Sequence, residues 1–308
     1  MTSRVLILLA ALIASACDGG GGSTSGTGHA GGGGGAAGGG AGDEAAATSG
    51  GAGGEAAATS GGAGGDGAAG GAGSGGSPAG LGVTGVLTDE GGQPIGGAPV
   101  LLCNTRVCYT DSSGADGRFT FRFDAKLPVD FVVKSMEDAE TAPRRGVTLF
   151  PLHFVDAVTV DAGPLFVPEL PAGAVPDPSR GEPQILEVGD GLRLTARCAD
   201  LLAPLGASLH DIAARRIPPE RVPALPDLGG EELVAVYAMY PFGTTTSGSL
   251  IGVQAPSDLA PGTRVRFRSM STYDGKLSAP VAGEADGAVV KTAPLSGIDE
   301  LTWLVISR

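Results

Sequence analysis

The four cysteines are the residues whose spacing points most directly to chemistry, and they occur in three settings. Cys17 directly follows Ala14-Ser15-Ala16, Cys103 and Cys108 flank Asn-Thr-Arg-Val, and Cys198 stands alone. Four intervening residues suit a disulfide that closes a tight hairpin, which an oxidising compartment would favour. The alternative is a zinc pair, which would need further ligands, and the three histidines lie well apart in the sequence. Cys198 is expected to be a buried structural thiol, with intermolecular pairing as its alternative.

The N-terminus has the features of a secretory signal. Arg4 precedes a nine-residue apolar run over 5–13, which is too short to span a bilayer, and a small-residue cleavage site follows. This stretch resembles a bacterial lipobox, with Ala14 where that motif usually has Leu. The resemblance implies a signal peptide over 1–16 and diacylglycerol on Cys17. We expect the lipid to anchor the chain in the bacterial cell envelope, in the outer membrane; the alternative is the inner membrane, which an aspartate directly after the cysteine, here Asp18, favours in some bacteria. The alternative is ordinary cleavage at the same bond, which leaves Cys17 as a free thiol.

No combination of nucleophile, base and acid converges in the sequence. Ser208 and His210 lie two residues apart in a segment with helical leucine spacing, and such residues do not face each other on a helix. The HExxH, Walker and dinucleotide-binding motifs are absent from the sequence. We therefore predict no enzyme activity, no metal and no cofactor. A hydrolase with an unrecognised pair of carboxylates is the remote alternative, because acidic residues are plentiful.

The charge balance argues against nucleic acid as a partner. The formal net charge is −13 and the pI is about 4.6, whereas nucleic-acid binders show a basic stripe. Arg264, Arg266 and Arg268 alternate along TRVRFRS, which is typical of the solvent face of a half-buried strand.

Aromatic residues are the remaining candidates for binding, since an exposed ring can stack on a sugar. Tyr109, Tyr237, Tyr240 and Tyr273 are the candidate ligand-contacting residues. Trp303 alternates with apolar neighbours in a predicted strand, so we assign it to the core.

Residues 17–80 predict a disordered tether behind the lipidated cysteine. The tract is almost entirely Gly, Ala, Ser and Thr, and it repeats EAAATSGGAGG at 44–54 and 55–65. It cannot bury enough apolar surface to offset the entropy of ordering its backbone. A Gly-rich coil of about 60 residues spans roughly 45 Å. Its expected function is to hold the folded part of the chain at a distance from the membrane.

The segment 81–162 predicts a β-sandwich of short strands separated by turns. Strands are expected at 83–88, 98–103, 107–110, 118–123, 129–133 and 147–152. The pattern VTGVLTDEGGQPIGGAPVLLC followed by CYTDSSGADGRFTFRF resembles the carboxypeptidase regulatory-like domain. This resemblance implies a transthyretin-like sandwich, sometimes grouped with carbohydrate-binding-like folds, that serves as an accessory module without catalytic residues.

A Pro-rich linker is predicted over 163–183, and a second β-rich domain over 184–308. Its strands are expected at 184–188, 192–197, 232–239, 250–253, 263–269, 288–292 and 301–306, with turns at Gly189-Asp190-Gly191, Asp274-Gly275 and Asp286-Gly287. One short helix is expected over 200–216, where leucines and Ile212 recur at helical spacing.

The sequence thus predicts an all-β chain: a transthyretin-like or Ig-like sandwich, then a β-rich domain with one short helix, behind a Gly-rich tether. The expected function is non-catalytic display of β-sandwich modules from a lipid anchor, for structural or adhesive contact. Its partners would be the membrane, through the lipid, and another surface protein or an envelope polysaccharide. The alternative function is a module that binds carbohydrate or a cell-envelope polymer.

Overall fold

The computed structural model describes residues 80–138, 142–177, 179–204 and 209–308. The chain divides into two units, 1–74 and 75–308, and the described residues all belong to the second. The predictions for the signal peptide, for Cys17 and for the tether therefore lie outside the described residues. Within the described residues the fold is all-β, with only two short 3-10 helices at Cys198–Asp200 and Pro219–Arg221. The predicted fold class is confirmed.

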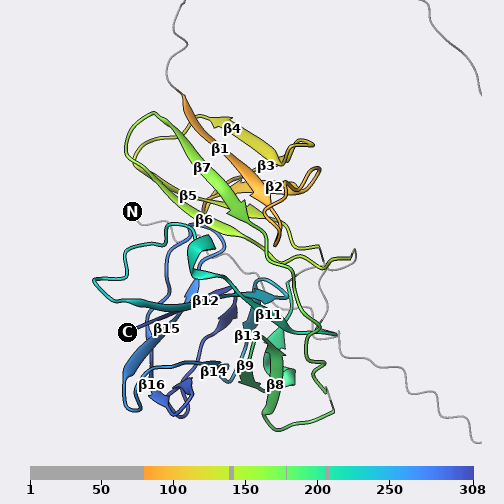
Figure 1. The fold of residues 1–308 in the computed structure, drawn as a ribbon, viewed down its shortest axis with the longest axis vertical. Helices are drawn as coiled ribbons and strands as arrows, with labels where there is room; N and C mark the ends of the chain where they lie inside the picture. Colours follow the sequence, from red (N-terminus) through yellow and green to blue (C-terminus); the bar gives the residue numbers. More distant parts are fainter. Residues whose placement is uncertain (1–79, 139–141, 178, 205–208) are drawn as a thin grey trace, which may run out of the picture. The chain divides into compact units, whose positions relative to one another are not determined.

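The first β region is a sandwich of two sheets. Its strands are β1 (Leu81–Thr88), β2 (Pro99–Cys103), β3 (Cys108–Ser112), β4 (Arg118–Phe123), β5 (Val129–Ser135), β6 (Leu149–Phe154) and β7 (Thr159–Phe166). One sheet has the order β4-β1-β7 and the other β3-β2-β5-β6. Figure 1 shows β1 running between its antiparallel partner β4 and its parallel partner β7.

Alternation of apolar and polar residues explains why these strands form a sandwich. In β4 the rings of Phe119, Phe121 and Phe123 are buried while the intervening side chains are exposed, because successive side chains in a strand point to opposite faces. The inward residues of both sheets form one core that includes Phe131 and Phe154. Several of its rings pack edge to face, with the centroids of Phe123 and Phe131 4.8 Å apart.

The second β region is built on one long, rolled sheet. Its strands are β8 (Gln184–Gly189), β9 (Leu192–Ala196), β10 (Leu201–Leu202), β11 (Ala213–Arg216), β12 (Leu233–Tyr240), β13 (Thr244–Thr246), β14 (Gly252–Pro256), β15 (Arg264–Met270), β16 (Val281–Asp286), β17 (Val289–Thr292), β18 (Glu300–Leu301) and β19 (Trp303–Ser307). Nine of them follow the order β11-β12-β19-β15-β16-β17-β14-β9-β8, and β10, β13 and β18 form a small second sheet. The end strands β8 and β11 contact each other, so the long sheet encloses its own core.

Two predicted turns close hairpins in this sheet. Asp190 and Gly191, between β8 and β9, have φ values of 46° and 74°. Positive φ at both central residues matches the twist of the flanking strands. Gly287, with φ 67°, follows Asp286 at the end of β16 and turns the chain into β17.

The two β regions share a third hydrophobic cluster. Val132 and Leu149 contribute from the outer face of the β3-β2-β5-β6 sheet, and Val236, Trp303 and Val305 from the outer faces of β12 and β19. The Trp303 side chain is fully buried, and its Nε1–H donates to the carbonyl oxygen of Val147 at 2.7 Å. The prediction that Trp303 lies in the core is confirmed. A shared core couples the two β regions into one body.

The prediction of a helix over 200–216 is wrong. The described parts of this segment form the end of a 3-10 helix, the strand β10 and the strand β11, while 205–208 lie outside the described residues. β11 pairs antiparallel with β12, and Ile212 is buried in the core of the rolled sheet. Tertiary pairing at the end of the sheet therefore overrides the helical spacing of the leucines.

The segment predicted as a linker, 163–183, is integrated into the fold. β7 extends to Phe166, so the expected boundary at residue 162 falls inside a strand. Further along, Glu169 forms a bridge with Arg145, and Ala174 forms one with Ile212.

Candidate functional site

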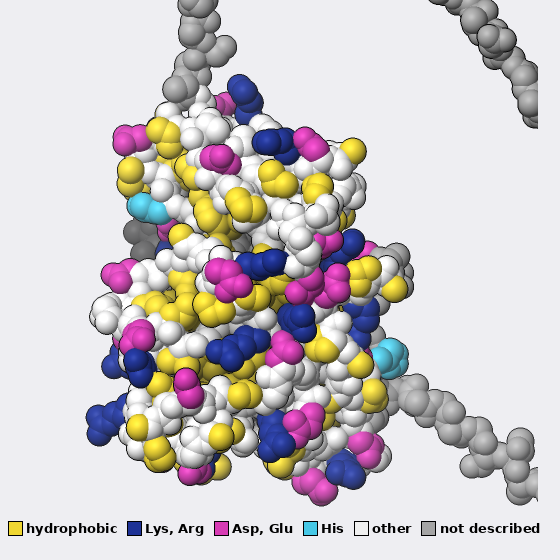
Figure 2. Space-filling model, viewed as in Figure 1, with side chains coloured by type: hydrophobic (Ala, Val, Ile, Leu, Met, Phe, Trp, Pro, Cys, Tyr) yellow, Lys and Arg dark blue, Asp and Glu magenta, His cyan; other side chains and the backbone are white. Residues whose placement is uncertain are grey.

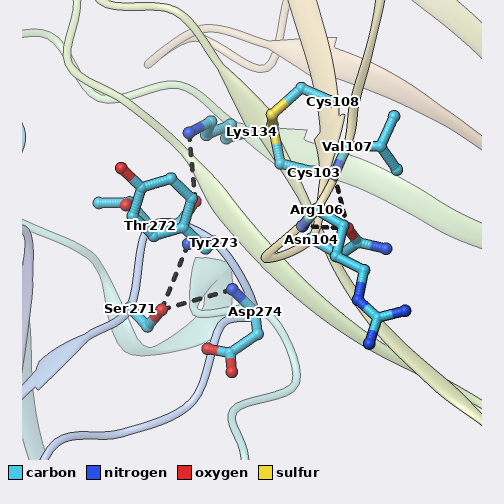
Figure 3. The surroundings of a disulfide bond; sticks show 10 residues. All are labelled: Cys103, Asn104, Arg106, Val107, Cys108, Lys134, Ser271, Thr272, Tyr273 and Asp274. Atoms are coloured by element: carbon cyan, nitrogen blue, oxygen red, sulfur yellow. Dashed lines mark hydrogen bonds between the residues drawn. A yellow bond between two sulfur atoms is a disulfide. The ribbon is translucent and has the colours of Figure 1, made fainter. Parts of the chain in front are cut away.

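The predicted disulfide between Cys103 and Cys108 is confirmed. It joins the last residue of β2 to the first residue of β3, with the two Cα atoms 4.0 Å apart. The Asn104 side chain organises the turn between them, because its Oδ1 accepts the backbone N–H groups of Arg106 and Val107 at 2.8 and 2.9 Å. Figure 3 shows this turn beside Tyr273 of the second β region. The disulfide thus fixes an edge hairpin close to the junction of the two regions.

The four candidate tyrosines do not form one surface. Tyr109 packs against Phe123 and Phe131 of the sandwich core, with centroid distances of 5.5 and 6.2 Å. Tyr237 is fully buried, and burial raises the pKa of its hydroxyl. Tyr240 is half-buried, and the Arg144 guanidinium lies 5.1 Å from its ring centroid.

Tyr273 differs from the other three because 58% of its surface is exposed. Its ring lies 5.8 Å from the ammonium group of Lys134. The four tyrosines therefore do not form a platform of coplanar rings on which a sugar could stack. Tyr273 offers a single exposed ring.

Polar contacts surround the shared core and cross between the two β regions. Lys134 of β5 donates to the carbonyl oxygen of Thr272 at 3.1 Å, and burial lowers the pKa of its amine. The ammonium of Lys276 lies 2.7 Å from a carboxylate oxygen of Asp130, whose other oxygen lies 2.6 Å from Nδ1 of His153. Hydrogen bonds from Lys276 and then from His153 lower the pKa of Asp130. This His–Asp pair therefore belongs to an inter-region ion-pair chain.

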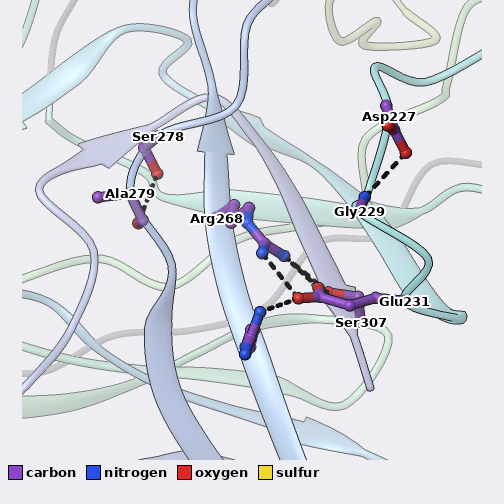
Figure 4. A network of polar contacts seen from close by, with 8 residues as sticks. Asp227, Gly229, Glu231, Arg268, Ser278, Ala279 and Ser307 are labelled. Carbon is purple, nitrogen blue, oxygen red and sulfur yellow. Dashed lines mark hydrogen bonds and ion pairs between the residues drawn. The ribbon is translucent and has the colours of Figure 1, made fainter.

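A second polar network joins β15 and β19 to the loop before β12. The Glu231 carboxylate accepts hydrogen bonds from Arg268 Nη1 at 2.7 Å and from Ser307 Oγ at 2.7 Å (Figure 4). It also forms an ion pair with Arg266. These donors, Arg268 first, hold the pKa of Glu231 at about 2. Arg268 is only 8% exposed, so Glu231 and Ser307 cover one of the three alternating arginines that were predicted to face solvent.

Metal-binding clusters are not found among the described residues. No group of three or more His, Cys, Asp or Glu side chains in this part of the chain could hold a metal ion. Cys198 is buried, as predicted, while Ser208 and Cys17 lie outside the described residues. Within these same residues, no helix is both long and apolar enough to cross a bilayer. On the face drawn in Figure 2, basic side chains lie interspersed with acidic ones.

One concave site lies in the first β region. A pocket of about 330 Å³ is formed by the segment 95–99, the segment 135–138, Arg145 and Val167. Glu137 is half-buried there, and its Oε2 accepts the backbone N–H of Phe242 at 3.0 Å. Burial raises the pKa of this carboxyl group. Arg145 is another lining residue, and its Nε–H is buried from solvent with no hydrogen-bond partner among the described residues.

Sequence reasoning missed this pocket. Its walls come from segments about 40 residues apart in the chain, brought together because β2 pairs with β5. The sequence signal was weak: two acids and an arginine around a short loop, with no recognisable motif.

No family model matches the chain, and neither does any curated protein. One solved structure that the chain resembles is the Streptococcal ancillary pilin, with 11% sequence identity. The match covers 75% of this chain and 54% of the pilin chain, at a TM-score of 0.24. The full-length major pilin SpaD from Corynebacterium diphtheriae has 10% identity over 74% of this chain and 55% of its own, at a TM-score of 0.24. Fervidolysin from Fervidobacterium pennivorans, a keratinolytic enzyme related to subtilisin, has 14% identity over 73% of this chain and 30% of its own, at 0.19.

The chain spans about half the length of the two pilins. At TM-scores of this size a match carries no argument about function, and these matches include both pilins and a protease.

Proposed function

We propose that this chain is a lipid-anchored protein of the bacterial cell envelope that displays a rigid, non-catalytic pair of β regions for structural or adhesive contact. The observation that carries the proposal is the hydrophobic cluster shared by the two regions, with Trp303 bonded to the Val147 carbonyl across it. Regions coupled through a shared hydrophobic core move as one body, whereas domains joined only by a linker move independently. A rigid body suits display.

The ionisable residues described above bind one another across strands and loops, and this supports a non-catalytic role. The Asp130–His153 pair also binds Lys276, and Glu231 binds two arginines, so these groups hold strands and loops together. Catalytic groups would instead converge on a shared cleft.

The sequence supports the anchor through the apolar run at 5–13 and the small residues before Cys17. The Gly-rich stretch to residue 80 would then separate the folded body from the bilayer. The finer assignment of the first region as a carboxypeptidase regulatory-like domain rests on the sequence pattern alone.

The anchor is tested by expressing the full chain in a bacterium and analysing the membrane fraction by intact mass. We expect Cys17 to be the first residue and to carry lipid, and Cys17→Ser to move the protein to the soluble fraction. Asp18→Asn, which keeps the thiol, should stay in the membrane. Soluble wild-type protein that begins at an unmodified Cys17 would overturn the anchor.

A further inference from the structure

The sheet of the first β region has an unpaired edge at β3. β3 pairs with β2 on one side, and no strand lies on its other side among the described residues. All of its residues except Tyr109 are exposed. An unpaired edge presents backbone N–H and C=O groups that can bond to an added strand, and folded proteins usually protect such edges.

The other edges of the described sheets are protected, and β3 is not. β4 carries the exposed cations Arg118 and Arg122, while β6 and β7 contain Pro151 and Pro164. The end strands of the rolled sheet contact each other, and the small sheet ends in strands of only 2 residues. β3 contains no Lys, Arg or Pro. Because such features hinder pairing with another chain, β3 is the described edge best suited to accept a strand.

Two residues of β3 direct their backbone groups to the open side. Hydrogen-bonded and non-hydrogen-bonded pairs alternate along an antiparallel ladder, and the Cα atoms of a non-hydrogen-bonded pair are about 4.5 Å apart. Cys103 and Cys108 form such a pair, since their Cα atoms are 4.0 Å apart. The alternation makes Leu101 and Thr110 the next one. The N–H and C=O groups of Cys108 and Thr110 therefore point away from β2, towards the position of an added strand.

The edge is held in place at both ends. The disulfide fixes one end of the β2–β3 hairpin. At the other end, the Ser113 N–H donates to the carbonyl oxygen of Ala98 at 2.9 Å, and Ser113 Oγ donates to the carbonyl oxygen of Ile95 at 2.7 Å. An ordered edge loses little conformational entropy when a partner strand pairs with it, which favours binding.

The side chains of the edge select the partner. Tyr109 and Asp111 are two residues apart in β3, so they point to the same face of the sheet. Tyr109 is half-buried at the margin of the sandwich core, with its ring centroid 5.5 Å from that of Phe123, and suits an apolar neighbour. Asp111 is exposed, and its carboxylate contacts only the backbone N–H of Ser112 among the described residues. A cation directly opposite Asp111 would complement its charge.

We propose that β3 accepts an extended segment of a partner protein as an added antiparallel strand, the more stable direction of pairing. The segment bonds to the backbone of Thr110 and Cys108, with a Lys or Arg opposite Asp111 and an apolar residue opposite Tyr109. In the segment, the basic residue therefore comes two positions before the apolar one. The inference rests on the proposed adhesive function and names its contact surface. Its test does not involve the lipid anchor, so the two can fail separately.

The test titrates the full chain carrying Cys17→Ser, which keeps the protein soluble, with a capped Thr-Thr-Lys-Thr-Val-Thr-Thr peptide. Its Lys and Val lie opposite Asp111 and Tyr109 when its central Thr pairs with Thr110. We expect saturable changes in the NMR shifts of the β3 backbone amides. The same peptide with an N-methylated central Thr should not bind, because it lacks the N–H that bonds to the Thr110 carbonyl. No saturable binding of the first peptide, or equal binding of the methylated one, would overturn the proposal.

Thr110→Pro tests the edge from the side of the protein. Because the Thr110 N–H points away from β2, the substitution removes no bond of the β2–β3 ladder, so it should keep the Tm while abolishing peptide binding. The matched control is Thr120→Pro at an exposed position of the β4 edge, which should bind the peptide as the parent chain does. Full binding by Thr110→Pro, or an equal loss in both proline variants, would contradict pairing at β3.

Asp111→Lys tests the charge preference while leaving the backbone groups in place. The variant should bind the Lys peptide about fivefold more weakly, and binding should return when Glu replaces Lys in the peptide. Affinities that ignore both charge reversals would contradict the role of Asp111. Self-association of the parent chain that Thr110→Pro abolishes, without any binding of the peptide, would assign the edge to a second copy of this chain and overturn the proposal.

Discussion

At the scale of single residues, Glu231 is the ionisable group most strongly shifted by its partners. Arg268, Ser307 and Arg266 stabilise its charged form and hold its pKa at about 2, below the ordinary value of 4.5. A depressed pKa means that the stabilisation is fully present above about pH 4.5. It is lost as the pH falls towards 2 and the folded carboxylate takes up a proton.

Glu231→Gln should therefore destabilise the protein by on the order of 2 kcal/mol at pH 7, with solvent at the exposed Arg266 reducing the full effect. The difference from wild type should shrink as the pH falls from 4.5 to 2, because the wild-type carboxylate becomes neutral. Urea unfolding across this pH range measures it. Glu232→Gln is the control, since Glu232 pairs with Arg308 at the exposed surface. Equal losses of stability in Glu231→Gln and Glu232→Gln would contradict the stabilising role of the Glu231 ion pairs. A difference from wild type that does not change with pH would contradict it as well.

Residue types alone could not tell which side chains reach solvent. Arg264, Arg266 and Arg268 alternate identically in the sequence, yet only Arg268 is buried, because Glu231 and Ser307 lie on its side of β15. The tyrosines show the same limit. Tyr237 and Tyr273 are of one type, but Tyr237 faces the core of the rolled sheet while Tyr273 lies in a surface loop.

At the scale of elements, regular alternation was the signal that the sequence carried best. The RFTFRF pattern predicted the strand at 118–123 with the bounds that β4 has. β7 was missed because Gly163 and Pro164 resemble a linker. Pro164 is tolerated there because β7 is an edge strand of its sheet and its ladder with β1 shifts register next to this residue.

The disulfide should matter most to the β2–β3 hairpin. Cys108→Ser keeps the buried Cys103 as a thiol and removes only the cross-link. Because the closed loop is short, with a sequence separation of 5, chain entropy predicts a loss of about 2 kcal/mol.

Urea unfolding of Cys108→Ser measures that loss, and hydrogen exchange locates it. Faster exchange should be largest at β3, the edge strand of its sheet. Thr110→Ser, an exposed substitution in the same strand, serves as the control. Unchanged stability on loss of the cross-link would show that the hairpin holds without it.

At the scale of the whole molecule, the shared core is the feature that the sequence analysis did not predict. A signal was present: Phe131-Val132-Val133 and Trp303-Leu304-Val305-Ile306 are continuous apolar runs, as in strands covered on both faces. Periodicity identifies such a strand but not what covers its second face. That pairing depends on long-range contacts, which place Val132 of β5 in the same cluster as Val305 of β19.

A shared core predicts that the two β regions unfold together. Trp303→Phe removes the N–H that bonds Val147 and part of the buried ring, so it should lower the free energy of unfolding by about 2–4 kcal/mol. Hydrogen exchange read at β1 and at β14, one strand from each region, should show the same loss of protection, because one cooperative unit has one global stability. Ile185→Ala, an exposed substitution on β8, should leave both strands unchanged. Loss of protection confined to β14 would mean that the regions unfold separately and that the body is not rigid.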